Sequence, residues 1–245
     1  MTQSLAFPEV LEAIRTQTTR LLGTTIEFGE DDWAAPTVLP GWTRSHVAAH
    51  LVEQAMRVSN ALYAEQEREL GPGRATLRCQ WERQAIEDGL ALQTRLDESA
   101  GQLQDALARL EHRDETVRIA DGWHVHASLV PAMRLRELVV HHFDLIGHAA
   151  FDVPNSVLLT IAEFETLRPH NAELPPVLLV SDEGFSARIG AESEDTTTVI
   201  GPLADLCLWL ARGIASDSMS GTSAVAMPLH ATPSAPSVGH ADATR

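Results

Sequence analysis

The fold is decided by two stretches, GWTRSHVAAH at residues 41–50 and RELVVHHFD at residues 136–144. Each combines apolar residues with polar side chains four positions apart, which a helix places on one face. The first pair is two histidines, and the second is Glu137 and His141. Imidazoles and a carboxylate on two packed helices can converge on one divalent cation, and zinc accepts such ligands. The two stretches therefore predict a metal site between two helices of a bundle.

The spacing leaves the choice of histidine open. His46 and His50 share a helix face, so either could bind the metal while the other lies at the surface or supports the site. His142 points about 100° away from His141 and is not expected to share the site. Each pair alone is also typical of a solvated helix face or an internal ion pair. The apolar neighbours favour a metal, because buried imidazole and carboxylate groups are costly without a partner.

Four helices are predicted around these two stretches. Gly71-Pro72-Gly73 ends the second helix, and Pro131 opens the fourth. Between the third and fourth, the Asp121-Gly122 turn predicts a hairpin or an irregular excursion. Short loops between amphipathic helices are typical of an up-and-down four-helix bundle, which we place at residues 1–152. The predicted helices span residues 7–22, 44–68, 77–110 and 132–149.

After Pro154 the pattern changes to that of a small α+β domain at residues 153–220. The sequence predicts two helices, at residues 156–167 and 203–214, and three short strands, at residues 177–180, 185–189 and 196–200. Residues 221–245 are rich in Ala, Pro, Ser, Thr and Gly and are predicted to form a flexible tail. The predicted fold class is mainly α, a bundle followed by a small α+β domain.

Composition excludes several classes of partner. The formal net charge is −16 over 245 residues, and the basic residues are not clustered, which argues against nucleic-acid binding. No apolar run reaches the ~18 residues of a membrane span, and the N-terminus lacks a secretory signal, so a cytoplasmic protein is expected. Cys79 and Cys207 form no CxxC pair, which indicates a reducing compartment without disulfides.

At these residues the sequence resembles the mycothiol-dependent maleylpyruvate isomerase family, part of the DinB/YfiT-like metal-binding superfamily. The resemblance rests on the helical His50 eight residues after Trp42, on the pattern E-x3-H-x2-D-L, and on ADLCLWLARGIASD in the C-terminal domain. It extends to about residue 220. It implies a DinB-like bundle that holds zinc, or another divalent metal, through His50, Glu137 and His141.

Three further residues follow from this resemblance or lie beside the ligands. The resemblance implies a catalytic arginine on the last helix, matched by Arg212, which would hold a substrate carboxylate. Arg83 is a candidate for binding the thiol cofactor or a carboxylate, with a solvated helix arginine as the alternative. Asp144, three residues after His141, either orients the ligand imidazole or packs between helices.

The activity implied by the resemblance is cis–trans isomerisation of maleylpyruvate to fumarylpyruvate, a step of gentisate-type aromatic degradation, with mycothiol as cofactor. A zinc-bound thiol loses its proton, adds to the cis double bond and leaves after rotation. The alternatives are a mycothiol S-transferase acting on another electrophile and a non-catalytic metal-dependent binding protein. The expected partners are a small substrate and a low-molecular-weight thiol, without nucleic acid or membrane, and the expected state is a monomer or homodimer.

Overall fold

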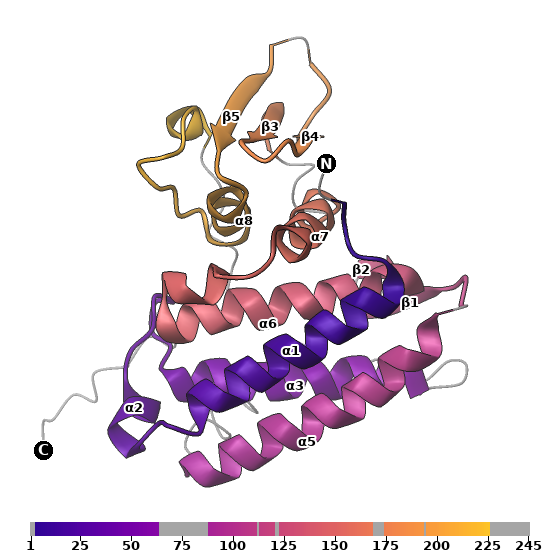
Figure 1. Cartoon of the computed structure of the whole chain (residues 1–245), viewed down its shortest axis with the longest axis vertical. Helices are drawn as coiled ribbons and strands as arrows, with labels where there is room; N and C mark the ends of the chain where they lie inside the picture. Colours follow the sequence, from indigo (N-terminus) through magenta and orange to yellow (C-terminus); the bar gives the residue numbers. More distant parts are fainter. Residues whose placement is uncertain are drawn as a thin grey trace, which may run out of the picture.

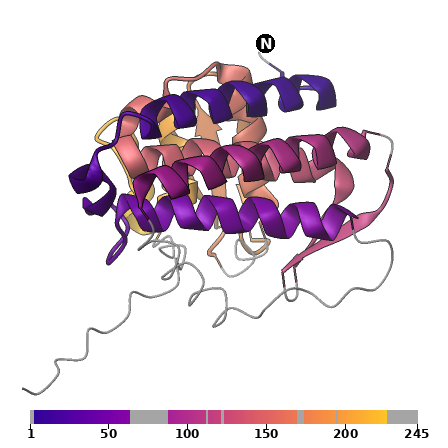
Figure 2. The same cartoon turned by 90° about the horizontal axis from the view of Figure 1, so that it is seen from below.

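The computed structural model describes residues 3–63, 88–111, 113–120, 123–168, 174–193 and 195–225. Its larger part is a helical bundle, and Figure 2 shows α1, α5 and α3 side by side with α6 behind them. The predicted mainly helical fold is confirmed. The four long helices are α1 (Phe7–Thr25), α3 (Arg44–Tyr63), α5 (Gly89–Leu107) and α6 (Val130–Ile146).

Helix α6 is the central element of the molecule. It is buried along nearly its whole length because α1 and α3 cover one side of it and α7 (Asn155–Thr166) covers another (Figure 1). A helix that is covered on all sides buries its polar residues together with its apolar ones. The polar side chains of α6 must therefore find partners inside the protein, and the candidate site is built from them.

The third helix is shorter than the sequence predicted. Helix α5 begins at Gly89, because the backbone of Asp88 is extended and its carboxylate caps the helix by accepting the N–H of Ala91 at 2.8 Å. The predicted single helix over residues 77–110 is therefore wrong at residue 88. Leu90, the second residue of α5, is 78% exposed. Residues 64–68 and 77–87 of the predicted helices lie outside the described residues.

Two smaller elements close the ends of the bundle. The predicted hairpin is confirmed as the antiparallel pair β1 (Thr116–Ala120) and β2 (Trp123–His126). The short helix α2 (Glu30–Ala34) was not predicted, since five residues carry too little periodicity. It places the buried Trp33 against the start of α5, where a Cβ on Gly89 would lie 2.2 Å from the indole Nε1.

The C-terminal part adds a small sheet and two helices. The strands are ordered β4–β3–β5, with β3 antiparallel to β4 and parallel to β5. Figure 1 shows this sheet stacked on α7 and α8, which lie on α6. We propose the domain boundary near residue 152, just before α7. The elements are α7, β3 (Val177–Ser181), β4 (Ser186–Ile189), β5 (Thr197–Gly201) and α8 (Leu203–Arg212).

The structure describes the start of the predicted tail, residues 221–225. Residues Thr222–Ala224 form a 3-10 turn and Val225 is buried. Residues 226–245 lie outside the described residues. Within the described ranges, none of the helices combines the length and the apolar character needed to cross a bilayer.

Candidate metal centre

The three predicted metal ligands meet between α3 and α6. The Nε2 atoms of His50 and His141 lie 3.4 and 3.2 Å from the same oxygen of Glu137, Oε2. One ligand atom from each residue lies within 4.8 Å of the other two. His141 is buried and the other two are partly buried. The structure thus brings together two side chains of α6 and one of α3 in a largely desolvated place.

This donor set fits a tetrahedral divalent cation. Ligand atoms placed about 2.0–2.1 Å from a tetrahedral zinc ion lie about 3.3 Å apart. The two separations from Glu137 Oε2, 3.4 and 3.2 Å, match that spacing. Two imidazoles and one carboxylate are also a ligand set of catalytic zinc sites, in which a fourth position stays open for water or substrate.

Asp144 fixes the orientation of the His141 ring. Its Oδ2 accepts the Nδ1–H of His141 at 2.8 Å, so the lone pair of Nε2 faces the carboxylate of Glu137. Two electron-rich atoms then face each other, an arrangement that a cation between them stabilises. Of the two roles considered for Asp144, the geometry supports the one that orients a ligand.

Arg212 lies behind Asp144. Its Nε and Nη2 donate to the two oxygens of Asp144 at 2.9 and 2.5 Å, and its Nη1 donates to the carbonyl of Ala211 at 3.0 Å. Burial opposes ionisation of Asp144, but the hydrogen bonds from Arg212 and His141 outweigh it and lower the carboxyl pKa to about 2. The binding of a substrate carboxylate by Arg212 stays a prediction. Such a carboxylate would have to compete with Asp144 and with the carbonyl of Ala211 for the guanidinium of Arg212.

The second oxygen of Glu137 is held by an ion pair that the sequence reasoning missed. Oε1 accepts from Arg136 Nη1 at 2.7 Å, and Arg136 Nε donates to Glu165 of α7 at 2.5 Å. Burial opposes ionisation of Glu137, yet Arg136 and the two imidazoles hold its carboxyl pKa well below the usual value. The available signal was an arginine placed directly before the ligand glutamate in an apolar helix.

The structure groups His50, rather than His46, with the other ligands. His46 instead accepts the backbone N–H of Thr43 at Nδ1, at 3.2 Å, and so contacts the start of its own helix. Trp42 packs against His50 with ring centroids 5.7 Å apart. Burial lowers the pKa of His50 to about 4, although the hydrogen bond to Glu137 opposes this. The imidazole is therefore neutral near pH 7, which is the form that binds metal.

The remaining sequence candidates lie apart from the cluster. His142 Nε2 is 2.9 Å from Thr24 Oγ1 on α1, and this direction away from the site is the predicted one. Cys207 is buried, donates to the carbonyl of Leu158 at 3.3 Å and has its thiol pKa raised by burial, so it does not serve as a nucleophile. Arg83 and Cys79 lie outside the described residues.

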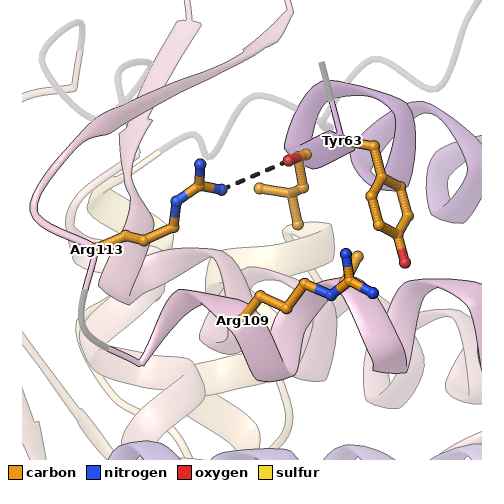
Figure 3. Close-up of a pocket in the computed structure, with 5 residues that line it drawn as sticks. Tyr63, Arg109 and Arg113 are labelled. Atoms are coloured by element: carbon orange, nitrogen blue, oxygen red, sulfur yellow. Dashed lines mark hydrogen bonds between the residues drawn. The ribbon is translucent and has the colours of Figure 1, made fainter. Parts of the chain in front are cut away.

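A cavity of about 270 Å³ opens at the far end of α3. Figure 3 shows Arg113 donating to the carbonyl of Leu62, at 3.5 Å, and Arg109 beside the ring of Tyr63, whose centroid is 5.0 Å from the guanidinium carbon. Tyr63 follows His50 by 13 residues, or about 20 Å along the helix. This cavity is separate from the candidate metal centre.

Comparison with known proteins identifies the family. The model of the mycothiol maleylpyruvate isomerase N-terminal domain matches residues 14–146, more than half of the chain. Solved structures of a mycothiol-dependent maleylpyruvate isomerase and of its histidine-to-alanine mutant are similar, each with a TM-score of 0.77 and 24% identity over 92% of this chain and 96% of the other. That likeness shows a shared fold, and a search of curated proteins finds no match. Because the family model spans the bundle with the clustered histidines and glutamate, the chain belongs to the mycothiol maleylpyruvate isomerase N-terminal domain family.

Proposed function

We propose that this protein is a mycothiol-dependent isomerase that converts maleylpyruvate to fumarylpyruvate at a zinc ion held by His50, Glu137 and His141. The observation that supports it is the three-ligand cluster, with donor separations of 3.2 and 3.4 Å, in a member of this family. A thiol held by such a cation supplies a sulfur nucleophile that can add to an activated alkene and leave again.

The residues of the chain hold and orient the ligand set. Arg136 favours the ionised form of Glu137, which needs its negative charge to bind a cation. Asp144 sets the tautomer of His141, and Arg212 holds Asp144 in place through two hydrogen bonds. Arg212 thus acts as a positioning residue in this proposal. Partial burial excludes most water and strengthens the electrostatic interactions inside the site.

The test is the thiol dependence of turnover in zinc-loaded protein. Conversion of maleylpyruvate, followed by its absorbance and by product analysis, is expected only when mycothiol is added. Equal rates with and without mycothiol would overturn the proposal. A stable thiol adduct in place of fumarylpyruvate would assign the protein to the thiol S-transferases instead. Binding of zinc and thiol with no conversion of any electrophile would indicate the non-catalytic alternative.

Metal content measured in the same preparations tests the proposed zinc ligands independently of the proposed reaction. His50→Ala, Glu137→Ala and His141→Ala are each expected to weaken zinc binding by at least about 100-fold, because each removes one of three ligands. His46→Ala is the matched control, since it removes a histidine of the same helix that contacts Thr43. Stoichiometric zinc in all three ligand variants would show that the metal is bound elsewhere.

A further inference from the structure

Arg134 lies one helical turn from the candidate metal centre. It precedes Glu137 by three residues and so shares the face of α6 that carries two of the ligands. Its Nη1 donates to Gln54 Oε1 at 2.7 Å, and Gln54 follows His50 by four residues on α3. The Arg134–Gln54 pair is therefore the next layer of the interface that holds the cluster, about 6 Å along the helices.

Within the described residues, the guanidinium of Arg134 is a buried cation with no carboxylate in direct contact. Its residue is 3% exposed, and its two acceptors, Gln54 Oε1 and the carbonyl of Leu51 at 3.5 Å, are neutral amide oxygens that both contact Nη1. Within the described parts of the chain, Nε and Nη2 have no hydrogen-bond partner and no carboxylate forms an ion pair with Arg134. Burial lowers its pKa to about 10, with the charge of Glu137 acting in the opposite direction.

The other buried arginines near the site are paired. Arg136 contacts Glu137 and Glu165, and Arg212 contacts Asp144 through two hydrogen bonds. A buried charge that is left unpaired is costly, and proteins usually avoid it unless it binds something. Arg136 also has one buried nitrogen, Nη2, without a partner among the described residues, but it contacts two carboxylates. In the described part of the chain no carboxylate contacts Arg134, and its Nε and Nη2 together form the side of a guanidinium that receives a carboxylate through two parallel hydrogen bonds.

A bound divalent cation makes the shortage of negative charge larger. The carboxylate of Glu165 is already shared by Arg136 and Arg168, and that of Asp144 is already paired with Arg212. Among the described residues, Glu137 is then the one carboxylate left to face both the cation and Arg134, so the site carries an excess of positive charge. A thiolate at the cation and one carboxylate at Arg134 would balance this excess.

We propose that Arg134 binds a carboxylate of the substrate beside the candidate metal centre, so that the site selects an anion whose carboxylate lies within a few atoms of the reacting double bond. The inference rests on the proposed function and adds to it the residue that recognises the substrate charge. Arg212 is less suited to this contact because all three of its guanidinium nitrogens already donate within the protein.

Gln54→Glu tests the proposal with little change in side-chain volume. It places a carboxylate where the amide oxygen lies 2.7 Å from Nη1, and so gives Arg134 a counter-ion from the protein itself. We use maleate, a cis dicarboxylate, as the probe and measure its Kd by calorimetry on zinc-loaded protein without thiol. Gln54→Glu is expected to weaken maleate binding at least about 10-fold while raising the melting temperature.

Two arginine variants complete the experiment. Arg134→Gln removes the proposed contact and is expected to weaken maleate binding about as much as Gln54→Glu does. Arg109→Gln, which removes an equal charge from an exposed position of η1 (Ala108–Leu110), is expected to keep the wild-type Kd. If Arg134→Gln does not fold, Gln54→Glu decides alone, because it retains the buried arginine.

Two results would overturn the inference. One is a folded, zinc-loaded Gln54→Glu protein that binds maleate with the wild-type Kd, which is the result expected if Arg134 only stabilises the fold. The other is a wild-type protein that binds no maleate at about 10 mM. Failure of the proposed isomerase activity has a different signature, since maleate binding would then still depend on Arg134 while maleylpyruvate is not converted.

Discussion

Asp144 is the residue on which the orientation of His141 depends. Its carboxylate accepts one hydrogen bond from the imidazole and two from Arg212. An asparagine offers only one acceptor oxygen at this place, and its amide nitrogen would face a donor. Asp144→Asn is therefore expected to weaken zinc binding by about 10–100-fold, the usual effect of losing a group that orients a metal-bound histidine. Competition with a zinc-binding dye measures this.

The control for this variant is Asp97→Asn, which changes an exposed carboxylate of α5 by the same chemistry. It should bind zinc as the wild type does. Circular dichroism of both variants checks that they are folded, since Asp144→Asn also deprives the buried Arg212 of its counter-ion. A folded Asp144→Asn protein with wild-type zinc affinity would contradict the orienting role.

At the scale of residues, the sequence predicts what depends on local spacing. Glu137 and His141 share a helix face because four residues make about one turn, and the structure brings both to His50. The choice between His46 and His50 could not come from spacing. It depends on the contact of His46 with Thr43. The contacts of Arg134 with Gln54 and of Arg136 with Glu165 depend on which helices pack against α6, so no local pattern reveals them.

At the scale of elements, the chain that follows α8 packs against the strand β5. Composition changes at residue 221, but the backbone there is held against β5 by the bridge between Ile200 and Ser220. Gly221 has a φ of +81°, and a Cβ on it would lie 2.0 Å from the carbonyl oxygen of Thr198. The sequence shows the change of composition at residue 221, but it does not show that residues 220 and 221 lie close to residues 198–200 of β5.

Gly221→Ala is expected to destabilise the protein by more than about 2 kcal/mol, because it combines backbone strain with a clash against main-chain atoms. Gly184→Ala is the matched control, since Gly184 has a φ of +94° but nothing within 4 Å of its Cβ position. Gly184→Ala should destabilise the protein through backbone strain alone, by about 1 kcal/mol. Urea unfolding compares the two. Equal decreases in the free energy of unfolding would mean that the close contact of Gly221 with β5 does not contribute to the effect.

At the scale of the whole molecule, two buried ion pairs connect the bundle to the C-terminal part. Arg136 of α6 contacts Glu165 of α7, and Asp144 of α6 contacts Arg212 of α8. The change of pattern near Pro154 predicted two parts, and the polar residues of α6 were visible in the sequence. The contacts between the two parts could not be predicted, because the ion pair between Arg136 and Glu165 depends on how α7 packs against α6.

Glu165→Gln tests whether these pairs make the two parts unfold together. Glu165 is 1% exposed and its loss leaves Arg136 with Glu137 as its remaining carboxylate, so we expect a cost of about 3 kcal/mol, the lower end for breaking a buried pair. Glu163→Gln, exposed on the same helix, should change stability by less than about 0.5 kcal/mol. Urea unfolding followed by circular dichroism and by tryptophan fluorescence should give coincident single transitions in both variants. Helix α6 carries two of the proposed metal ligands and also the residues that contact α7 and α8. Two separated unfolding transitions in the wild type would therefore show that the C-terminal part does not support the site. Equal stability of the two variants would lead to the same conclusion.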